Sequence, residues 1–227
     1  MKIVVFDLDD TLYDEMTYVE SGFHAVASYL SECLAVNAED CLNTMLIELS
    51  RNGRGKVFDN TLLHYRIYSK GTVQECVRTY RSHTPQIQLY RDAQLTIERL
   101  FQQGIPMYIV TDGNKHVQLK KLKALGLYDL PGIKKCYISR RFGLKNEKPS
   151  PYCFDQICTK ENVSPSNVVY IGDNPNKDFI GIKPLGFKTI RILRGSFAEI
   201  QKPVDYEADR TISTLDELWK GEIFNGV

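Results

Sequence analysis

The first thirteen residues, MKIVVFDLDDTLY, join a short apolar run directly to an acidic cluster, and this junction constrains the fold most strongly. Residues 3–6 are β-branched or aromatic without a polar interruption, which predicts a strand buried on both faces, as in a parallel sheet. Asp7, Asp9 and Asp10 follow at once and therefore lie at the carboxyl end of the strand, where open α/β sheets place their ligand crevice. Asp7 and Asp9 share one face if the strand geometry continues, and charges so close favour a divalent cation or a shared proton between them. Asp10 is expected to point to the other face and to be structural.

Bulk properties exclude several classes of function. The chain has 227 residues, enough for one large domain or a domain with an insertion, and 43% hydrophobic and 25% charged residues are ordinary for a soluble globular protein. A net charge of +1 gives no support for a nucleic-acid partner, and no apolar stretch reaches the roughly 20 residues that span a bilayer. The six cysteines include no C-x-x-C pair, and the N-terminus lacks the layout of a signal peptide. We expect reduced cysteines, a cytoplasmic location, and neither a membrane nor a nucleic acid as partner.

Two patterns divide the chain. Residues 15–84 show apolar positions at helical spacing, for example at 60–68 and 72–81, and no good strand signal. From residue 85 onward strands and helices alternate. Strands are expected at 105–110, 135–138, 168–171 and 188–192, with an edge strand at 211–212. Helices are expected at 114–125, 151–160 and 177–185, with a terminal helix that begins at an N-cap, Ser213 or Thr214. The pattern predicts an α/β fold, a parallel sheet with helices on both faces, interrupted by an inserted helical block.

Polar residues follow the later strands too. Thr111-Asp112-Gly113 comes after the second expected strand, Lys148 after the third, and Asp173 and Asp178 after the fourth. Each has an ordinary explanation by itself, as an N-cap turn, a surface lysine or an acid in the first turn of a helix. Four successive strands that deliver Asp, Thr, Lys and Asp to the same edge of one sheet are hard to explain by capping alone.

On these residues the chain resembles the haloacid dehalogenase-like hydrolase superfamily, whose four motifs occur here in order. The matching residues are Asp7-Leu8-Asp9-Asp10-Thr11, Thr111, Lys148 in the run KPSPYCF, and Gly172-Asp173 with Asp178. The inserted helical block resembles, by position, length and helicity, the small helical cap of the phosphatase branch of that family. The resemblance implies a Rossmann-like core domain, residues 1–14 and 85–227, and a helical cap domain, residues 15–84.

The resemblance also implies roles for the acidic residues. Asp7 would be the nucleophile that forms an aspartyl-phosphate, which water then cleaves, and Asp9 would be the general acid and then the general base. Mg²⁺ held by Asp7, the backbone carbonyl of Asp9 and Asp173 would relieve the repulsion between the carboxylate and the phosphate.

The remaining motif residues would hold the phosphoryl group. Thr111, backbone N–H groups around Asp112 and Gly113, and Lys148 are expected to contact its oxygens. Asp178 would orient Lys148 or a metal-bound water, although an exposed acid in a first helical turn explains it equally well. Asp112 departs from the Asn found in many relatives, and phosphate binding survives this change if its backbone, rather than its side chain, faces the phosphate.

The acid at position 9 reduces the number of reaction classes that the resemblance allows. By family resemblance, transport ATPases carry Thr at this place, phosphonatases carry Ala, and dehalogenases lack an acid–base carboxylate. The leading interpretation is therefore a Mg²⁺-dependent phosphatase for a small soluble phosphomonoester, such as a sugar phosphate, nucleotide or phosphorylated acid. A phosphomutase is the first alternative because it needs the same acid, and a phosphate-binding protein without turnover is the second.

The insertion is the expected place of substrate specificity. Arg51, Arg54 and Lys56 lie in a glycine-containing segment that could hold an anionic or hydroxyl-rich part of the substrate, although a solvated loop between helices is the simpler interpretation. Tyr13 could line the mouth of the site or pack in the core. The sequence leaves open which phosphate ester is the substrate and whether the protein is a monomer or a homodimer.

Overall fold

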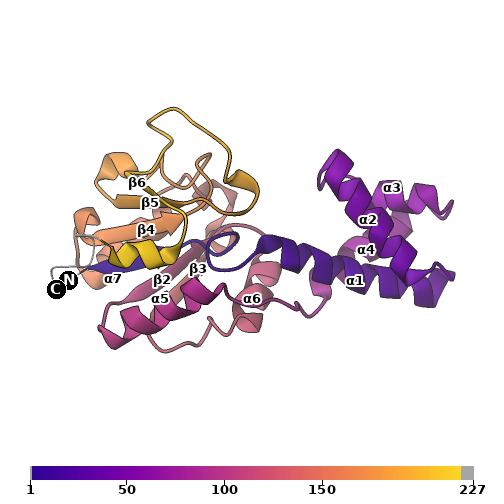
Figure 1. Ribbon diagram of the computed structural model, residues 1–227, viewed down its shortest axis with the longest axis horizontal. Coiled ribbons are helices and arrows are strands. Elements are labelled where there is room, and N and C mark those ends of the chain that lie inside the picture. The colour runs from indigo at the N-terminus through magenta and orange to yellow at the C-terminus, as the bar shows by residue number, and fades with distance from the viewer. Residues whose placement is uncertain (1, 221–227) are drawn as a thin grey trace. The chain divides into compact units, whose positions relative to one another are not determined.

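The computed structural model describes residues 2–220; Met1 and residues 221–227, the outer ends of the expected core domain, lie outside the described residues. The chain divides into two compact units. The first comprises the chain up to Glu15 and from Gln88 onward, and the second is Met16–Ile87. Figure 1 shows the ribbon of both units, with the chain leaving the sheet after its first strand and returning to it later.

The first unit is built on a sheet of six parallel strands in the order β3-β2-β1-β4-β5-β6. The strands are β1 (Ile3–Phe6), β2 (Met107–Thr111), β3 (Ile133–Ile138), β4 (Val168–Gly172), β5 (Lys188–Ile192) and β6 (Arg210–Ile212). The predicted Rossmann-like α/β fold is thereby confirmed. Because the chain moves from β1 to β2 and β3 on one side and then to β4 on the other, the strand order switches at β1, where such sheets bind ligands at the carboxyl ends.

The α-helices of this unit precede or follow strands and cover the sheet. They are α5 (Arg91–Gln102), α6 (Lys115–Ala124) and α7 (Tyr152–Glu161). Phe154 and Ile157 of α7 pack against the sheet face that carries Val5 and Tyr170, all of them buried. β1 is 0–1% exposed along its whole length, as its uninterrupted apolar run predicts.

The prediction of a helix at 177–185 is wrong. This segment forms tight turns and only a short 3-10 helix, Lys183–Leu185. Pro184 supplies no backbone N–H and cannot continue a helix. Gly181 packs so closely that a Cβ atom there would lie 1.6 Å from the carbonyl oxygen of Pro149. The terminal helix is likewise a 3-10 helix, Leu215–Trp219, although it does begin at Thr214 with a capping box to Glu217.

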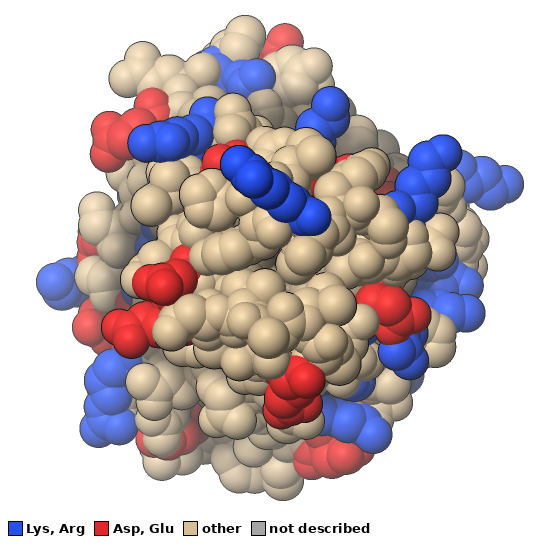
Figure 2. Space-filling model, turned by 90° about the vertical axis from the view of Figure 1, so that its right-hand side faces the viewer, with Lys and Arg blue, Asp and Glu red and all other residues tan. Residues whose placement is uncertain are grey.

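The second unit contains the inserted helices and has a hydrophobic core of its own. Its helices are α1 (Glu15–Leu34), which starts at the boundary, α2 (Ala38–Asn52), α3 (Val57–His64) and α4 (Lys70–Ser82). Phe23, Leu30, Met45, Leu62 and Cys76 are among its buried residues. On the face shown in Figure 2, positive and negative side chains are interspersed and do not gather into a field of one sign. No helix within residues 2–220 is long and apolar enough to cross a membrane.

Candidate active site

The polar residues that end the strands meet around one cavity of about 410 Å³ in the first unit. Its lining includes Asp7, Asp9, Thr111, Asp112, Gly113, Lys148 and Asp173. The motif residues predicted to bind metal and phosphate therefore come together, although they are spread over more than 160 positions of the sequence.

The backbone after β1 places the acidic cluster at this cavity. The N–H of Asp7 donates to the carbonyl oxygen of Ile171 at 2.8 Å, which extends the pairing with β4 by one residue. The chain then turns at Asp10, whose φ is 53°. The Asp10 carboxylate accepts the backbone N–H groups of Glu15 and Ser196, so it binds two loops together, in keeping with the structural role expected for it.

Lys148 forms a buried ionic network beneath the cavity. Its Nζ lies 2.8 Å from Oδ1 of Asp7 and 2.8 Å from Oδ1 of Asp178, and it donates to the hydroxyl of Tyr170 at 2.8 Å. The lysine side chain is 2% exposed. Burial alone would lower the pKa of Lys148, but Asp178 and Asp7 raise it well above its ordinary value, so the side chain carries its charge. The contact with Asp178 is the arrangement expected of an acid that orients this lysine.

Three carboxylates form a cluster suited to a hard cation. One oxygen each from Asp7, Asp173 and Asp178 lies within 4.8 Å of the others, and all three residues are buried. Burial, followed by the negative charges of Asp178 and Asp7, raises the pKa of Asp173 to about 9. Burial also raises the pKa of Asp7, to about 6, against the lowering effect of Lys148. Grouped carboxylate oxygens whose charge the protein only partly neutralises fit Mg²⁺, which prefers oxygen ligands.

The carboxylate of Asp9 points to a different set of partners. Its Oδ1 accepts from Nζ of Lys121 at 2.6 Å and from the hydroxyl of Tyr13 at 2.5 Å, and its Oδ2 accepts from Nε2 of Gln118 at 2.8 Å. Burial raises the pKa of Asp9, but Lys121 and the hydrogen bonds from Tyr13 and Gln118 together hold it below its ordinary value. Asp9 is thus a carboxylate with three donors, and its side chain remains 23% exposed toward the cavity.

The Asp112 side chain accepts hydrogen bonds from other residues of the protein. It accepts from Oγ of Ser139 at 2.5 Å, from the backbone N–H of Lys148 at 3.2 Å and from Nζ of Lys177 at 3.1 Å. Burial raises its pKa, but Lys148 and Lys177 outweigh this and keep it below the ordinary value. The negative charge of Asp112 is therefore compensated by hydrogen-bond donors. These donors link the end of β2 to the two later motif loops.

Several residues of the site were not found from the sequence, and the cavity lining itself includes Glu15, Arg140 and Glu147 among them. Gln118, Lys121, Tyr170 and Lys177 contact the motif residues, and the first two lie three positions apart on one face of α6. Lys121 could not be told from Lys120 and Lys123 beside it, because only the tertiary structure shows which lysine is buried.

The residues predicted for specificity belong to both units. Tyr13 is fully buried, and its hydroxyl contacts Asp9. Arg51, Arg54 and Lys56 are exposed and belong to the second unit, and their contact with a substrate stays a prediction.

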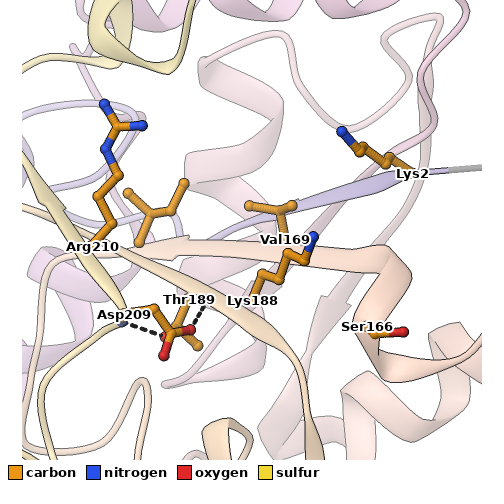
Figure 3. Close-up of a pocket in the computed structure, with 8 residues that line it drawn as sticks. Lys2, Ser166, Val169, Lys188, Thr189, Asp209 and Arg210 are labelled. Atoms are coloured by element: carbon orange, nitrogen blue, oxygen red, sulfur yellow. Dashed lines mark hydrogen bonds between the residues drawn. The ribbon is translucent and has the colours of Figure 1, made fainter. Parts of the chain in front are cut away.

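A second cavity of similar size lies near the opposite, amino-terminal ends of β1, β4 and β5. Its volume is about 400 Å³, and Lys2, Val169, Lys188 and Arg210 are among the residues that line it (Figure 3). Asp209 is the one carboxylate of this lining, and it already accepts from the backbone N–H and the hydroxyl of Thr189. The lining offers no group of metal ligands, so the acidic cavity is the candidate active site.

Comparisons with known proteins identify the family of the chain. Residues 1–186 match the family model of the haloacid dehalogenase-like hydrolases. The chain is 31% identical over 225 residues to a glyceraldehyde 3-phosphate phosphatase of Methanocaldococcus jannaschii, with 96% of this chain and 95% of the relative covered. It is 25% identical over 232 residues to a phosphoglycolate phosphatase of Neisseria gonorrhoeae, with 97% and 92% covered. Its fold resembles that of a HAD hydrolase, YfnB from Bacillus subtilis, with a TM-score of 0.66, 21% identity, and 96% and 97% of the two chains covered. Motifs, fold and family model lead to the same conclusion: the chain belongs to the haloacid dehalogenase-like hydrolases.

Proposed function

We propose that this protein is a Mg²⁺-dependent phosphatase that hydrolyses a small phosphomonoester through an aspartyl-phosphate on Asp7. The reaction class, hydrolysis of a phosphoric monoester, follows from the family and from the relatives, which are named as phosphatases. The observation that carries the proposal is the pairing of two carboxylates with different surroundings at one cavity. Asp7 lies in the acidic cluster beside Lys148, whereas Asp9 lies apart, held by Lys121, Gln118 and Tyr13.

Asp7 and Asp173, with the backbone carbonyl of Asp9, would hold the metal ion. When bound, Mg²⁺ supplies positive charge that neutralises both the cluster and the incoming phosphate. Asp178 is the third carboxylate of the cluster, and its ion pair with Lys148 favours a role in fixing that lysine.

The protein groups divide the remaining work. Lys148 and the Thr111 hydroxyl hold the phosphoryl oxygens, while the carboxylate of Asp7 attacks phosphorus. Asp9 gives a proton to the departing alkoxide and later takes one from the water that cleaves the aspartyl-phosphate. Its position outside the acidic cluster leaves it available for proton transfer.

The test is phosphate release from p-nitrophenyl phosphate with and without Mg²⁺. We expect release that needs the metal and is abolished by Asp7→Asn, whereas Asp129→Asn, an exposed acid on the same unit, retains it. Acid quench during turnover with ³²P-labelled substrate should trap label on the wild-type protein. No release from any phosphate ester by folded, metal-loaded protein would disprove the phosphatase, and if no isomer formed from a hexose 1-phosphate either, only the phosphate-binding protein would be left.

A phosphomutase stays the alternative because it would use the same acid–base residue. Incubation with a hexose 1-phosphate separates the two reactions: a mutase returns the 6-phosphate, and a phosphatase returns free hexose and phosphate.

The substrate is proposed as a small phosphorylated carbon compound. Glyceraldehyde 3-phosphate and phosphoglycolate, after which the relatives are named, are the first esters to test, followed by a panel of sugar phosphates and nucleotides. A cytoplasmic location and a monomeric or homodimeric state remain predictions.

A further inference from the structure

Lys121 is an unusual residue to find inside a protein. It is only 3% exposed, whereas Lys123 on the same helix is exposed. Lysine is almost never fully buried unless a partner compensates its charge. Its Nζ lies 2.6 Å from Oδ1 of Asp9 and 3.6 Å from Oε1 of Glu15, so the buried charge faces the proposed acid–base residue.

Gln118, one turn earlier on α6, contacts two residues of the proposed mechanism at once. Its Nε2 donates to Oδ2 of Asp9 at 2.8 Å and to Oγ1 of Thr111 at 2.6 Å. An amide nitrogen carries two hydrogens, so these two bonds use both of them. The Thr111 hydroxyl accepts from Gln118, and its own proton therefore remains for a phosphoryl oxygen.

The same count can be made on Asp9. A carboxylate has about four acceptor sites, two on each oxygen. Tyr13 and Lys121 take those on Oδ1, and Gln118 takes one on Oδ2. The remaining site is on Oδ2, and Asp9 lines the cavity.

We propose that Lys121 and Gln118 are positioning residues that fix the Asp9 carboxylate so that Oδ2 transfers the proton, with Gln118 also turning the Thr111 hydroxyl toward the phosphoryl group. This inference rests on the proposed function, in which Asp9 is the acid–base residue. Two side chains of α6 would thereby orient both Asp9, which faces the leaving group, and Thr111, which faces the phosphoryl group.

The test compares two substrates that differ in their need for an acid. The leaving group of an alkyl phosphate such as glyceraldehyde 3-phosphate needs a proton, whereas that of 2,4-dinitrophenyl phosphate departs readily without one. Because general acids contribute about 10²–10⁴-fold, we expect Lys121→Met to lower kcat/KM for the alkyl ester by about tenfold or more and to leave the dinitrophenyl ester within about threefold. Lys123→Met, on the exposed side of α6, should change neither value.

Gln118→Leu should give a different result. Because it also releases the Thr111 hydroxyl, both esters should react more slowly and bind with higher KM, and the alkyl ester should lose more. Gln103→Leu, an exposed residue at the end of α5, is the control.

A second measurement applies if Lys121→Met folds poorly. In the double variant Asp9→Asn/Lys121→Met both charges of the pair are gone, so its Tm should recover relative to Lys121→Met alone. Equal slowing of both esters in Lys121→Met, or no recovery of Tm, would overturn the positioning role while leaving the proposed function intact. Absence of hydrolysis by the wild-type protein with either ester would instead overturn the proposed function and this inference with it.

Discussion

The hydroxyl of Tyr170 lies 2.8 Å from Nζ of Lys148, deep under the cavity, and it donates onward to Oδ1 of Asp178 at 3.1 Å. The tyrosine is 0% exposed, so water cannot replace it. One hydroxyl thus accepts from a buried ammonium and donates to a buried carboxylate, which joins β4 to the loops that carry both charges.

Removal of this hydroxyl should lower the stability of the folded protein. Tyr170→Phe leaves a buried ammonium and a buried carboxylate each short of one partner, and we expect a loss of about 2 kcal/mol in the free energy of unfolding. Urea unfolding measures this, with Tyr128→Phe, an exposed tyrosine, as the control. A change below about 0.5 kcal/mol would show that the hydroxyl bond is energetically unimportant.

Mg²⁺ should raise the thermal stability through the acidic cluster. A ligand that binds only the folded protein stabilises it by about 2.7 kcal/mol at 100 times its Kd. We expect a Tm that rises with Mg²⁺ and falls again with EDTA, and an Asp173→Asn variant whose Tm no longer responds. Because that substitution also removes a like charge from among Asp7, Asp173 and Asp178, its Tm without metal should exceed that of the wild type. An unchanged response to Mg²⁺ in Asp173→Asn would place the ion elsewhere.

Acid should destabilise the contact that ties α5 to the C-terminal 3-10 helix. Asp92 pairs with Arg194 and accepts the backbone N–H of Leu215 and the hydroxyl of Thr214. Burial raises the pKa of Asp92, but these hydrogen bonds outweigh it and lower the pKa below its ordinary value. The folded state therefore favours the carboxylate, and its contribution is complete above the unfolded pKa of about 3.9 and is lost as the pH falls through the lower folded value.

We accordingly expect Asp92→Asn to cost about 2 kcal/mol at pH 7 and progressively less below pH 4. Urea unfolding of both proteins at several pH values from 7 to 3 measures the difference. A gap that is constant with pH would mean that the charge of Asp92 contributes nothing.

Gly195 should tolerate no side chain. Its φ is +59°, and a Cβ atom there would lie 2.0 Å from the Asp10 carboxyl carbon. Gly195→Ala combines backbone strain with a clash against the residue that binds two loops, so we expect a loss of about 3 kcal/mol in the free energy of unfolding. Gly55→Ala, where no atom lies within 4 Å and φ is unstrained, should change stability by less than about 1 kcal/mol. Similar effects of the two substitutions would contradict the close packing of Gly195 on Asp10.

Residues whose role depends on local pattern were the ones the sequence could predict. The apolar run that forms β1 and the polar residues at strand ends are recognisable from neighbouring residues in the chain. The sequence therefore sufficed to predict that Asp7, Thr111, Lys148 and Asp173 lie at one edge of a sheet. The helix prediction for segment 177–185 was wrong because Pro184 and the contact with Pro149 determine the path of the chain there. The spacing of apolar residues contains no information about either.

Side chains that act by long-range contact could not be predicted. Lys121 lies 112 positions from Asp9, and Tyr170 lies 22 positions from Lys148. A buried lysine and a surface lysine look alike in a helix until the packing of the helix on the sheet is known. Tyr13 lies only four positions from Asp9, but its hydroxyl is directed at Asp9 by a turn that the sequence does not specify.

The division of the chain at Glu15 and Gln88 has a consequence for how such enzymes diversify. Every described side chain that lines the acidic cavity belongs to the first unit, and residues 16–87 enclose a separate hydrophobic core. The helical insert can therefore be exchanged for that of a relative through two junctions without replacing one residue of the charge network. We expect chimaeras made in this way to keep the chemistry of the recipient and to inherit the preference of the donor, so that new substrates can be reached by transplantation as well as by point substitution.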